Sequence, residues 1–235
     1  MNVLNTGAWP VSYNLEGIEE MKKKREVTKA QRHRGVEGGL VLRGTLVLFM
    51  VLMMAVYARA ELITISLTAR VRTVDDNSNY LKGQINVGDL ITGYYTYEST
   101  TVDSDPSWDV VGIYWHYNSP CGIILNAGGF VFQTDPANVE FLLEVVNNYP
   151  EHGDNYLVRS YNNLPIYDDI GAGVISWQLD DNSGAALSGD SLPITAPVLT
   201  DWSSLSGLTI DGIRTYLIRA DVISAELIPE PASAV

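Results

Sequence analysis

Three carboxylates lie on one short polar run, DSDPSWD at residues 103–109. Calcium prefers several oxygen ligands, and alternating Asp side chains in a loop can supply them. The run predicts a calcium site formed by Asp103, Asp105 and Asp109, with calcium as the one cofactor that the sequence offers. Because Pro106 and the spacing depart from an EF-hand loop, a solvated turn is the alternative interpretation.

Aromatic residues form the second candidate site. Trp108, Trp115 and Tyr117 lie within ten residues of one another, between two polar segments. Exposed aromatic rings can hold sugar rings by stacking on their apolar faces, so these three residues predict a platform for glycans. Core packing and cross-strand pairing are the alternative interpretation.

Other catalytic chemistry has little support. His116 and His152 stand apart from each other and from the spacings of zinc motifs, and no triad partner can be chosen for them. Glycoside hydrolysis needs two carboxylates that flank the scissile bond, and no motif selects such a pair. Cys121 is the one cysteine, so an intrachain disulfide is impossible, and we expect a small buried apolar residue there.

Short strands are the elements that would position these residues. Leu62–Val71 alternates apolar and polar residues and is rich in β-branched side chains, as is typical of a strand with one solvent-facing side. The polar cluster at 75–79 predicts a turn. Further strands are expected at Asp89–Glu98, Val110–Tyr117, Gly122–Leu125, Phe130–Gln133, Val139–Val146, Tyr156–Ser160, Gly173–Leu179 and Gly212–Leu227.

The pattern predicts an all-β fold, a single antiparallel β-sandwich of jelly-roll-like type, preceded by an N-terminal signal helix. Val139–Asn147 fits either a buried strand or a helical turn. Alternation places Tyr95 and Tyr97 on one face of their strand and Tyr94 on the other.

The segment Gly44–Tyr57 is fourteen residues long and uncharged, and it lies between Arg43 and Arg59. It is shorter than the roughly 20 apolar residues of a membrane span. A secretory signal has a run of this length followed by a small-x-small cleavage site. We therefore expect signal peptidase to recognise Ala58 and Ala60 and to cut after Ala60, with an uncleaved anchor as the alternative.

Three segments follow from these patterns. Residues 1–60 are the N-terminal extension and signal peptide, and Met21, which begins MKKKREVTKAQRHRG, is the expected true start. Residues 61–227 are the β-sandwich domain. Residues 228–235 are expected to form an exposed tail, because prolines at 229 and 231 lack a backbone N–H and favour extended geometry before them.

Charge separates the two main segments. Residues 1–60 carry a net charge of +4, whereas residues 61–235 hold six basic and 23 acidic residues, a net charge of −17. Such acidity argues against a nucleic-acid partner, since phosphate binding needs a basic surface. It is compatible with cation binding or with contact to neutral sugars.

The C-terminus, Pro229-Glu230-Pro231 followed by small residues, resembles the start of the PEP-CTERM sorting signal of exported bacterial proteins. In that family a hydrophobic helix and an arginine cluster follow, so here the signal is interpreted as truncated after its first motif. The resemblance implies that an exosortase-type membrane enzyme is a partner, in bacteria that make exopolysaccharide.

A second resemblance covers most of residues 61–235. Leu62–Val71, Gly88–Tyr97 and Leu179–Gly184 are similar to the extracellular domains that often carry PEP-CTERM signals. This implies an exported protein of the cell surface, extracellular matrix or periplasm, with extracellular polysaccharide as a partner. The favoured interpretation is a non-enzymatic, glycan-binding protein. A carbohydrate-active enzyme of jelly-roll type and a calcium-stabilised structural module are the alternatives.

Overall fold

The computed structural model describes residues 61–150 and 152–229, and within them it contains strands and one short 3-10 helix. The expected signal helix, Met21, Ala58, Ala60, Glu230 and Pro231 lie outside the described residues. The elements are β1 (Leu62–Asp75), β2 (Leu90–Glu98), β3 (Val111–His116), β4 (Gly122–Ala127), β5 (Phe130–Gln133), β6 (Phe141–Tyr149), β7 (Gly153–Ser160), β8 (Pro165–Tyr167), β9 (Ile170–Gly171), β10 (Val174–Asp181), η1 (Leu199–Asp201), β11 (Leu205–Asp211) and β12 (Leu217–Ile228).

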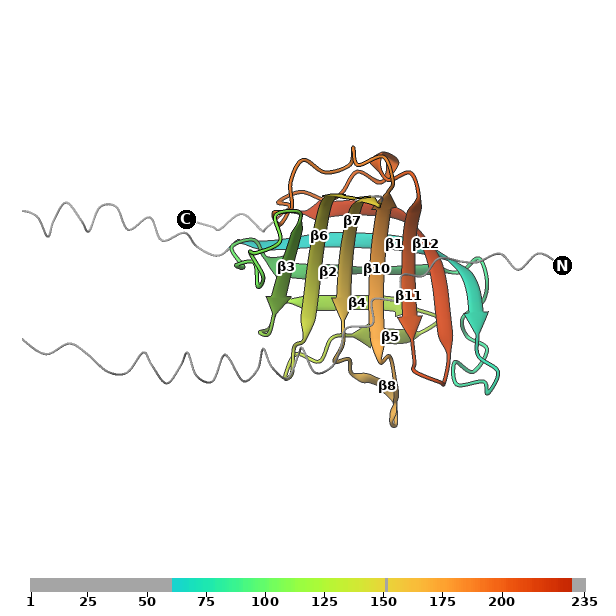
Figure 1. Cartoon of the computed structure of the whole chain (residues 1–235). Coiled ribbons are helices and arrows are strands. Elements are labelled where there is room, and N and C mark those ends of the chain that lie inside the picture. Colours follow the sequence, from blue (N-terminus) through green and yellow to red (C-terminus); the bar gives the residue numbers. More distant parts are fainter. Residues whose placement is uncertain (1–60, 151, 230–235) are drawn as a thin grey trace, which may run out of the picture. The chain divides into compact units, whose positions relative to one another are not determined.

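Ten strands form one antiparallel sheet in the order β3-β6-β7-β10-β11-β12-β1-β2-β4-β5, and β8 pairs with β9 separately. The sheet curls over on itself, so that β1, β2, β4 and β5 cross behind β3, β6, β7, β10 and β11 (Figure 1). The predicted all-β, antiparallel class is confirmed. The jelly-roll-like sandwich is not confirmed, because hydrogen bonding continues through all ten strands instead of dividing them into two sheets.

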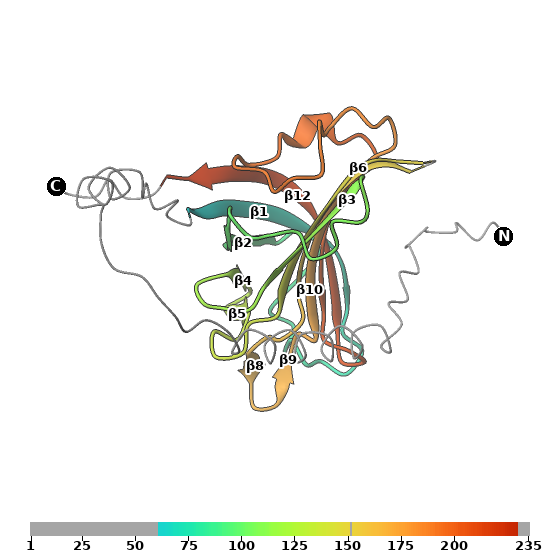
Figure 2. The same ribbon diagram turned by 60° about the vertical axis from the view of Figure 1, so that its left-hand side comes forward.

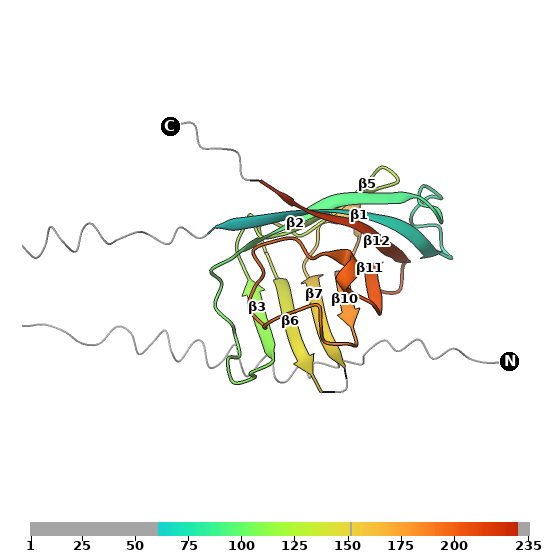
Figure 3. The ribbon, with the colours of Figure 1, turned by 90° about the horizontal axis from the view of Figure 1, so that it is seen from above.

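Two long strands carry the sheet around the bend. β1 has 14 residues and β12 has 12, and they pair along almost their whole length. The register shifts between Thr68 and Ala69, where Ile223 is the extra residue, and again between Val71 and Thr73. Such bulges bend a strand and increase its twist. β12, which runs with β1 (Figure 3), pairs with β11 only over Leu217–Asp221 and with β1 along almost its whole length.

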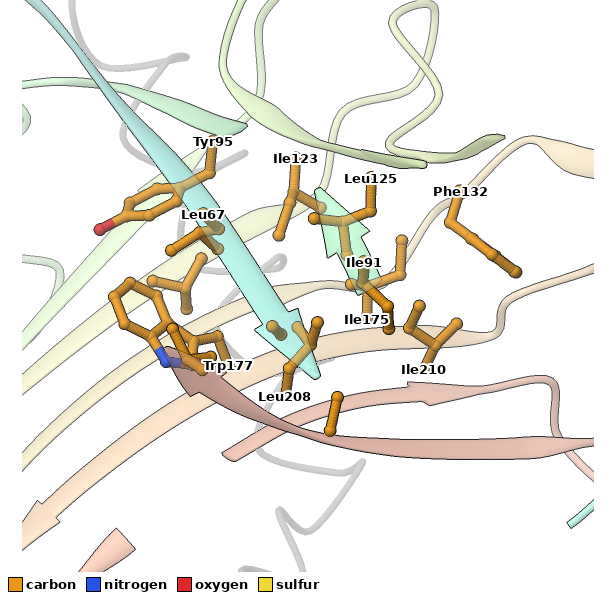
Figure 4. Close-up of a cluster of buried hydrophobic side chains, with 14 of the residues drawn as sticks. Leu67, Ile91, Tyr95, Ile123, Leu125, Phe132, Ile175, Trp177, Leu208 and Ile210 are labelled. Atoms are coloured by element: carbon orange, nitrogen blue, oxygen red, sulfur yellow. The ribbon is translucent and has the colours of Figure 1, made fainter. Parts of the chain in front are cut away.

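The core fills the space between the two layers. Side chains from β1, β2 and β4 face those from β10 and β11 (Figure 4). Tyr95 and Tyr97 are fully buried while Tyr94 is 40 % exposed, which confirms the predicted alternation. The ring of Tyr95 meets the edge of buried Trp177 with the centroids 5.6 Å apart. Each large buried apolar side chain contributes about 1.5–3 kcal/mol, so this layer is the main source of stability.

The free side of β5 is covered by the chain that follows β7. Leu164 N donates to Gln133 O over 2.9 Å, and Thr134 forms a β-bridge with Asn163. The hydroxyls of Thr134 and Ser160 are 2.8 Å apart and buried. Paired in this way, β5 leaves less of its backbone open to another chain. The β8–β9 hairpin lies beside this junction (Figure 2).

Most strand predictions agree with the structure, including Val139–Asn147, which is a strand rather than a helical turn. The strands β8, β9 and β11 were not predicted. Gly212–Leu227 was predicted as one strand, but a turn at 212–216 precedes β12. Ile213 has φ 45° in this turn. A β-branched residue rarely adopts that conformation. The signal for the turn is the pair Asp211-Gly212, where Asp211 Oδ1 accepts from Ile213 N over 2.8 Å.

The last strand ends at Ile228, close to the expected Leu227, and Pro229 is exposed. Within residues 61–150 and 152–229 there is no helix with the length and apolar character of a membrane span.

Candidate functional site

Three aromatic rings lie next to one another on the outer face of the sheet. Trp115 on β3 and Tyr117 just beyond it have ring centroids 6.0 Å apart and ring planes within 16° of each other. On the other side, the ring of Tyr161 lies 5.6 Å from that of Trp115, tilted by 33°. Tyr117, Trp115 and Tyr161 are called the aromatic row below.

Strand alternation and register explain how the row assembles. β3 turns Tyr114 into the core and Trp115 outward. Trp115 pairs with Leu142 of β6, and Leu142 pairs with Arg159 of β7, so these residues cross the sheet on one line. Tyr161 follows Arg159 by two residues, and side chains two residues apart along a strand point to the same face. Its ring therefore reaches back over β6 to Trp115.

Polar groups border the aromatic row. Arg159 Nη1 donates to Tyr161 Oη over 3.3 Å, and the guanidinium carbon lies 5.9 Å from the ring centroid. Arg159 Nε is buried and has no hydrogen-bond partner. Asn162 Nδ2 donates to Glu140 Oε2 over 3.0 Å, and Tyr161 N donates to Glu140 O over 3.0 Å. A guanidinium, an amide and a carboxylate therefore lie within one or two residues of the rings.

Trp108 does not join this row. It lies in the loop before β3, near Val111, whereas Trp115 lies toward the other end of that strand. Trp108 is 51 % exposed, and its ring has no contact with the aromatic row in the described part of the chain. The structure thus brings together two of the three predicted platform residues, and Tyr117 keeps 45 % of its surface exposed. The structure adds Tyr161 to the row. Its spacing of two residues from Arg159 was the signal in the sequence that both side chains lie on one face.

The predicted calcium ligands lie in the same loop, but the carboxylate of Asp103 already has partners. Its Oδ1 accepts from Asp105 N and from Ile113 N, each over 3.0 Å. Ser104 N donates to Ile113 O over 2.8 Å. The loop thereby satisfies both backbone groups of Ile113 on the outer edge of β3, which protects that edge from pairing.

The other two predicted ligands differ from Asp103. Asp105 Oδ1 accepts from Ser107 Oγ over 2.6 Å, and Asp109 is exposed. Among the described residues, no three His, Cys, Asp or Glu side chains are grouped so that they could hold a metal ion. The calcium site stays a prediction.

The buried His116 and Cys121 are poor reactive groups. Burial lowers the pKa of His116, whose Nε2 lies 2.9 Å from Thr101 Oγ1. Burial also raises the pKa of the Cys121 thiol to about 11, and Glu98 adds to the shift. A protonated thiol is a weak nucleophile. Cys121 is buried, which confirms the prediction of a small buried residue at this position.

A long segment between β10 and β11, residues 182–204, is called the strap. Two tyrosines of the core hold it: Tyr97 Oη donates to Pro193 O over 2.7 Å, and Tyr114 Oη donates to Asp190 O over 2.9 Å. Trp202 at its end is buried, with its ring 6.5 Å from that of Tyr156. The strap is thus part of the packed domain.

Two buried carboxylates also fasten the strap. Asp154 is 1 % exposed and accepts from Asn148 N and Leu187 N, each over 2.7 Å. Asp181 accepts from the hydroxyls of Ser183 and Ser203, each over 2.6 Å. These hydrogen bonds hold the pKa of Asp181 well below its usual range.

Family models, curated proteins and solved structures were compared with this chain, and none of them matches it. Function is indicated instead by the aromatic row, its polar neighbours and the sequence patterns at the two ends of the chain.

Proposed function

We propose that this chain is an exported, non-enzymatic glycan-binding protein of the bacterial cell surface or exopolysaccharide matrix. The observation that carries the proposal is the aromatic row with Arg159, Glu140 and Asn162 beside it. Binding sites for small ligands combine apolar, aromatic surface with a few well-placed polar groups. Export by signal peptidase and anchoring by an exosortase-type enzyme belong to the same proposal and rest on the sequence.

A sugar ring has apolar C–H faces and a rim of hydroxyls, and the two parts of the site match these features. The rings of Trp115 and Tyr117 offer apolar surface. Asn162 and Arg159 supply N–H donors, and Glu140 supplies carboxylate oxygens. Each aromatic contact is worth about 0.5–1.5 kcal/mol beyond area burial. We expect a Kd of about 1 mM for one sugar, which equals about −4 kcal/mol.

Weak single sites are sufficient when the ligand is a polymer. Many chains displayed on one surface, or one chain with many repeating sugars, convert weak contacts into strong overall binding. We further propose that the two layers of the curled sheet act as a sandwich that keeps the row rigid. Trp115 is on β3, and Tyr117 and Tyr161 each directly follow the end of a strand. Residues positioned on strands hold their geometry better than residues on loops.

The test compares polysaccharide binding by the wild type with that of two variants. Trp115→Ala removes the central ring of the aromatic row, and we expect about a tenfold loss of affinity, equal to about 1.4 kcal/mol. Trp108→Ala is the matched control, because it removes an exposed tryptophan outside the row. Its affinity should stay within about twofold of the wild type.

Affinity electrophoresis in gels that contain soluble polysaccharide measures all three proteins under the same conditions. Equal affinity of the Trp115→Ala variant and the wild type, or an equal loss in both variants, would refute the proposed site. Release of soluble sugars from the polysaccharide would favour the alternative of a carbohydrate-active enzyme. A loss of binding with a calcium chelator would favour the calcium-stabilised module.

A further inference from the structure

A single cation, Arg159, lies at one end of the aromatic row. Its guanidinium carbon is 5.9 Å from the centroid of the Tyr161 ring, and that ring is 5.6 Å from the ring of Trp115. Across the sheet, Arg159 pairs with Leu142 of β6 and with Ser176 of β10, which are both uncharged. The row therefore continues from aromatic rings to a guanidinium on the same outer face.

The guanidinium has few partners in the protein. One N–H of Nη1 donates to Tyr161 Oη over 3.3 Å. Nε is buried without a hydrogen-bond partner, so the charge is partly removed from water. Within residues 61–150 and 152–229, the salt bridges join β1 to β12, and Arg159 takes part in none of them. Because partly buried charges are costly unless they are paired, this guanidinium favours an anionic partner.

The outer end of the guanidinium suits a carboxylate. Nη1 keeps a second N–H beside the one that Tyr161 accepts, and Nη2 keeps both of its own. These donors lie in one plane, and a carboxylate presents two oxygens in one plane, so the two groups can form parallel hydrogen bonds. A sugar hydroxyl presents one uncharged oxygen. The guanidinium therefore gains more from a carboxylate than from a hydroxyl.

Two glutamates of β6, Glu140 and Glu144, lie diagonally across from Arg159. Diagonal neighbours are about 7–8 Å apart, whereas a carboxylate bound to a guanidinium lies about 2.7–2.9 Å from its nitrogens. Glu140 accepts from Asn162 Nδ2 over 3.0 Å, and Glu144 has an interaction of its own. Because Coulomb energy falls with distance and is screened by salt, the close pair outweighs these more distant repulsions.

Resting on the proposed function, we propose that the site recognises polysaccharides with uronic acid units, and that Arg159 binds the carboxylate of such a unit. The sugar ring stacks on the aromatic row, and its hydroxyls bind Glu140 and Asn162. The rings supply affinity for any pyranose. Arg159 sets the difference in affinity between an acidic and a neutral sugar, which is the specificity of the site.

The test uses one polymer in two forms at pH 7. A glucan oxidised at C6 to the carboxylate is immobilised beside the methyl ester of the same polymer, which has the same rings and no charge. Wild type should bind the acid form about tenfold more tightly than the ester, which equals about 1.4 kcal/mol. Residues 61–235 hold six basic and 23 acidic residues, so their overall charge disfavours a polyanion, and this preference requires a local cation.

Three variants assign the preference. Arg159→Gln keeps N–H donors but removes the charge, so affinity should fall about threefold for the ester and about thirtyfold for the acid, and their ratio becomes about one. Arg159→Lys keeps the charge without the planar pair of donors, and its ratio should be about three. Arg214→Gln is the matched control, because it removes one charge from an exposed residue between β11 and β12. Its ratio should stay at about ten.

The ratio of the two affinities separates carboxylate recognition from positioning of Tyr161. The inference is overturned if Arg159→Gln lowers both affinities by the same factor, since Arg159 then only orients that ring. It is also overturned if wild type does not prefer the acid form, or if Arg214→Gln loses the preference as well. Melting temperatures verify that all variants are folded.

Trp115→Ala distinguishes failure of this inference from failure of the proposed function. Loss of the central ring should lower both affinities by a similar factor and keep their ratio. If Trp115→Ala leaves binding to both forms unchanged, the site itself is wrong, and the proposed function fails with it.

Discussion

Asp154→Asn is the substitution with the clearest expected effect on stability. Each carboxylate oxygen of Asp154 accepts one backbone N–H over 2.7 Å, from Asn148 on the β6–β7 side and from Leu187 in the strap. Asparagine has almost the same shape, but one of its two terminal groups is an NH2. That group meets a buried N–H donor instead of accepting from it.

The magnitude follows from these two contacts. A hydrogen bond to a charged group is worth about 1.5–3 kcal/mol, and an unsatisfied buried donor costs about 1–3 kcal/mol. Because Asp154 is 1 % exposed, water cannot replace the lost partner. We expect a loss of about 3 kcal/mol, which for a domain of this length lowers the melting temperature by about 6–12 °C.

Urea denaturation followed by tryptophan fluorescence measures the change, because buried Trp177 and Trp202 report on the core and on the end of the strap. Asp135→Asn is the control: its carboxylate accepts from Ala137 N in an exposed turn, and we expect less than about 0.5 kcal/mol there. A change below about 0.5 kcal/mol for Asp154→Asn, or equal changes in both variants, would show that the strap is not fastened in this way.

Two further predictions concern the residues near β3. Burial lowers the pKa of His116, so its contribution to stability is complete above the unfolded pKa of about 6.5 and is lost as pH falls toward the folded pKa. Between pH 7 and pH 5, the free energy of unfolding should therefore fall less steeply in the His116→Gln variant than in wild type. Parallel curves of free energy against pH would contradict this prediction. The Asp103→Ala variant leaves Ile113 N without its acceptor, so its melting temperature should drop equally with and without millimolar calcium. A drop that occurs only when calcium is present would instead support the predicted metal site.

The sequence was most informative where a local pattern decides the structure. Alternation alone placed Tyr95 and Tyr97 inside and Tyr94 outside, because strand side chains point to opposite faces in turn. Gly, Pro, Asn and Asp clusters marked most strand ends for a similar reason, since they favour turns. The turn that contains Ile213 was missed although the turn-forming pair Asp211-Gly212 precedes it, because a β-branched residue rarely has a positive φ.

Features that depend on long-range pairing could not be predicted in this way. The curl of the sheet follows from pairing β1 with β12, for example Thr64 with Ile228, and no local pattern connects them. Likewise, Tyr161 joins Trp115 only because β6 lies between β3 and β7 in one particular register. The role of Asp103 is similar, because its partner Ile113 is ten residues away.

The two bulges between β1 and β12 have a consequence for how the gene can change. Thr68 pairs with Ser224 before the first bulge, and Thr73 pairs with Arg219 after the second, so the extra residues Ile223 and Arg72 offset each other. A codon deletion at either position would remove one bulge and leave the residue pairs on both sides of it in place, because the bulged residue is the one left unpaired. Such a deletion changes the local bend and twist of the two strands and not their register, so each of these distant segments can change length by one residue independently of the other.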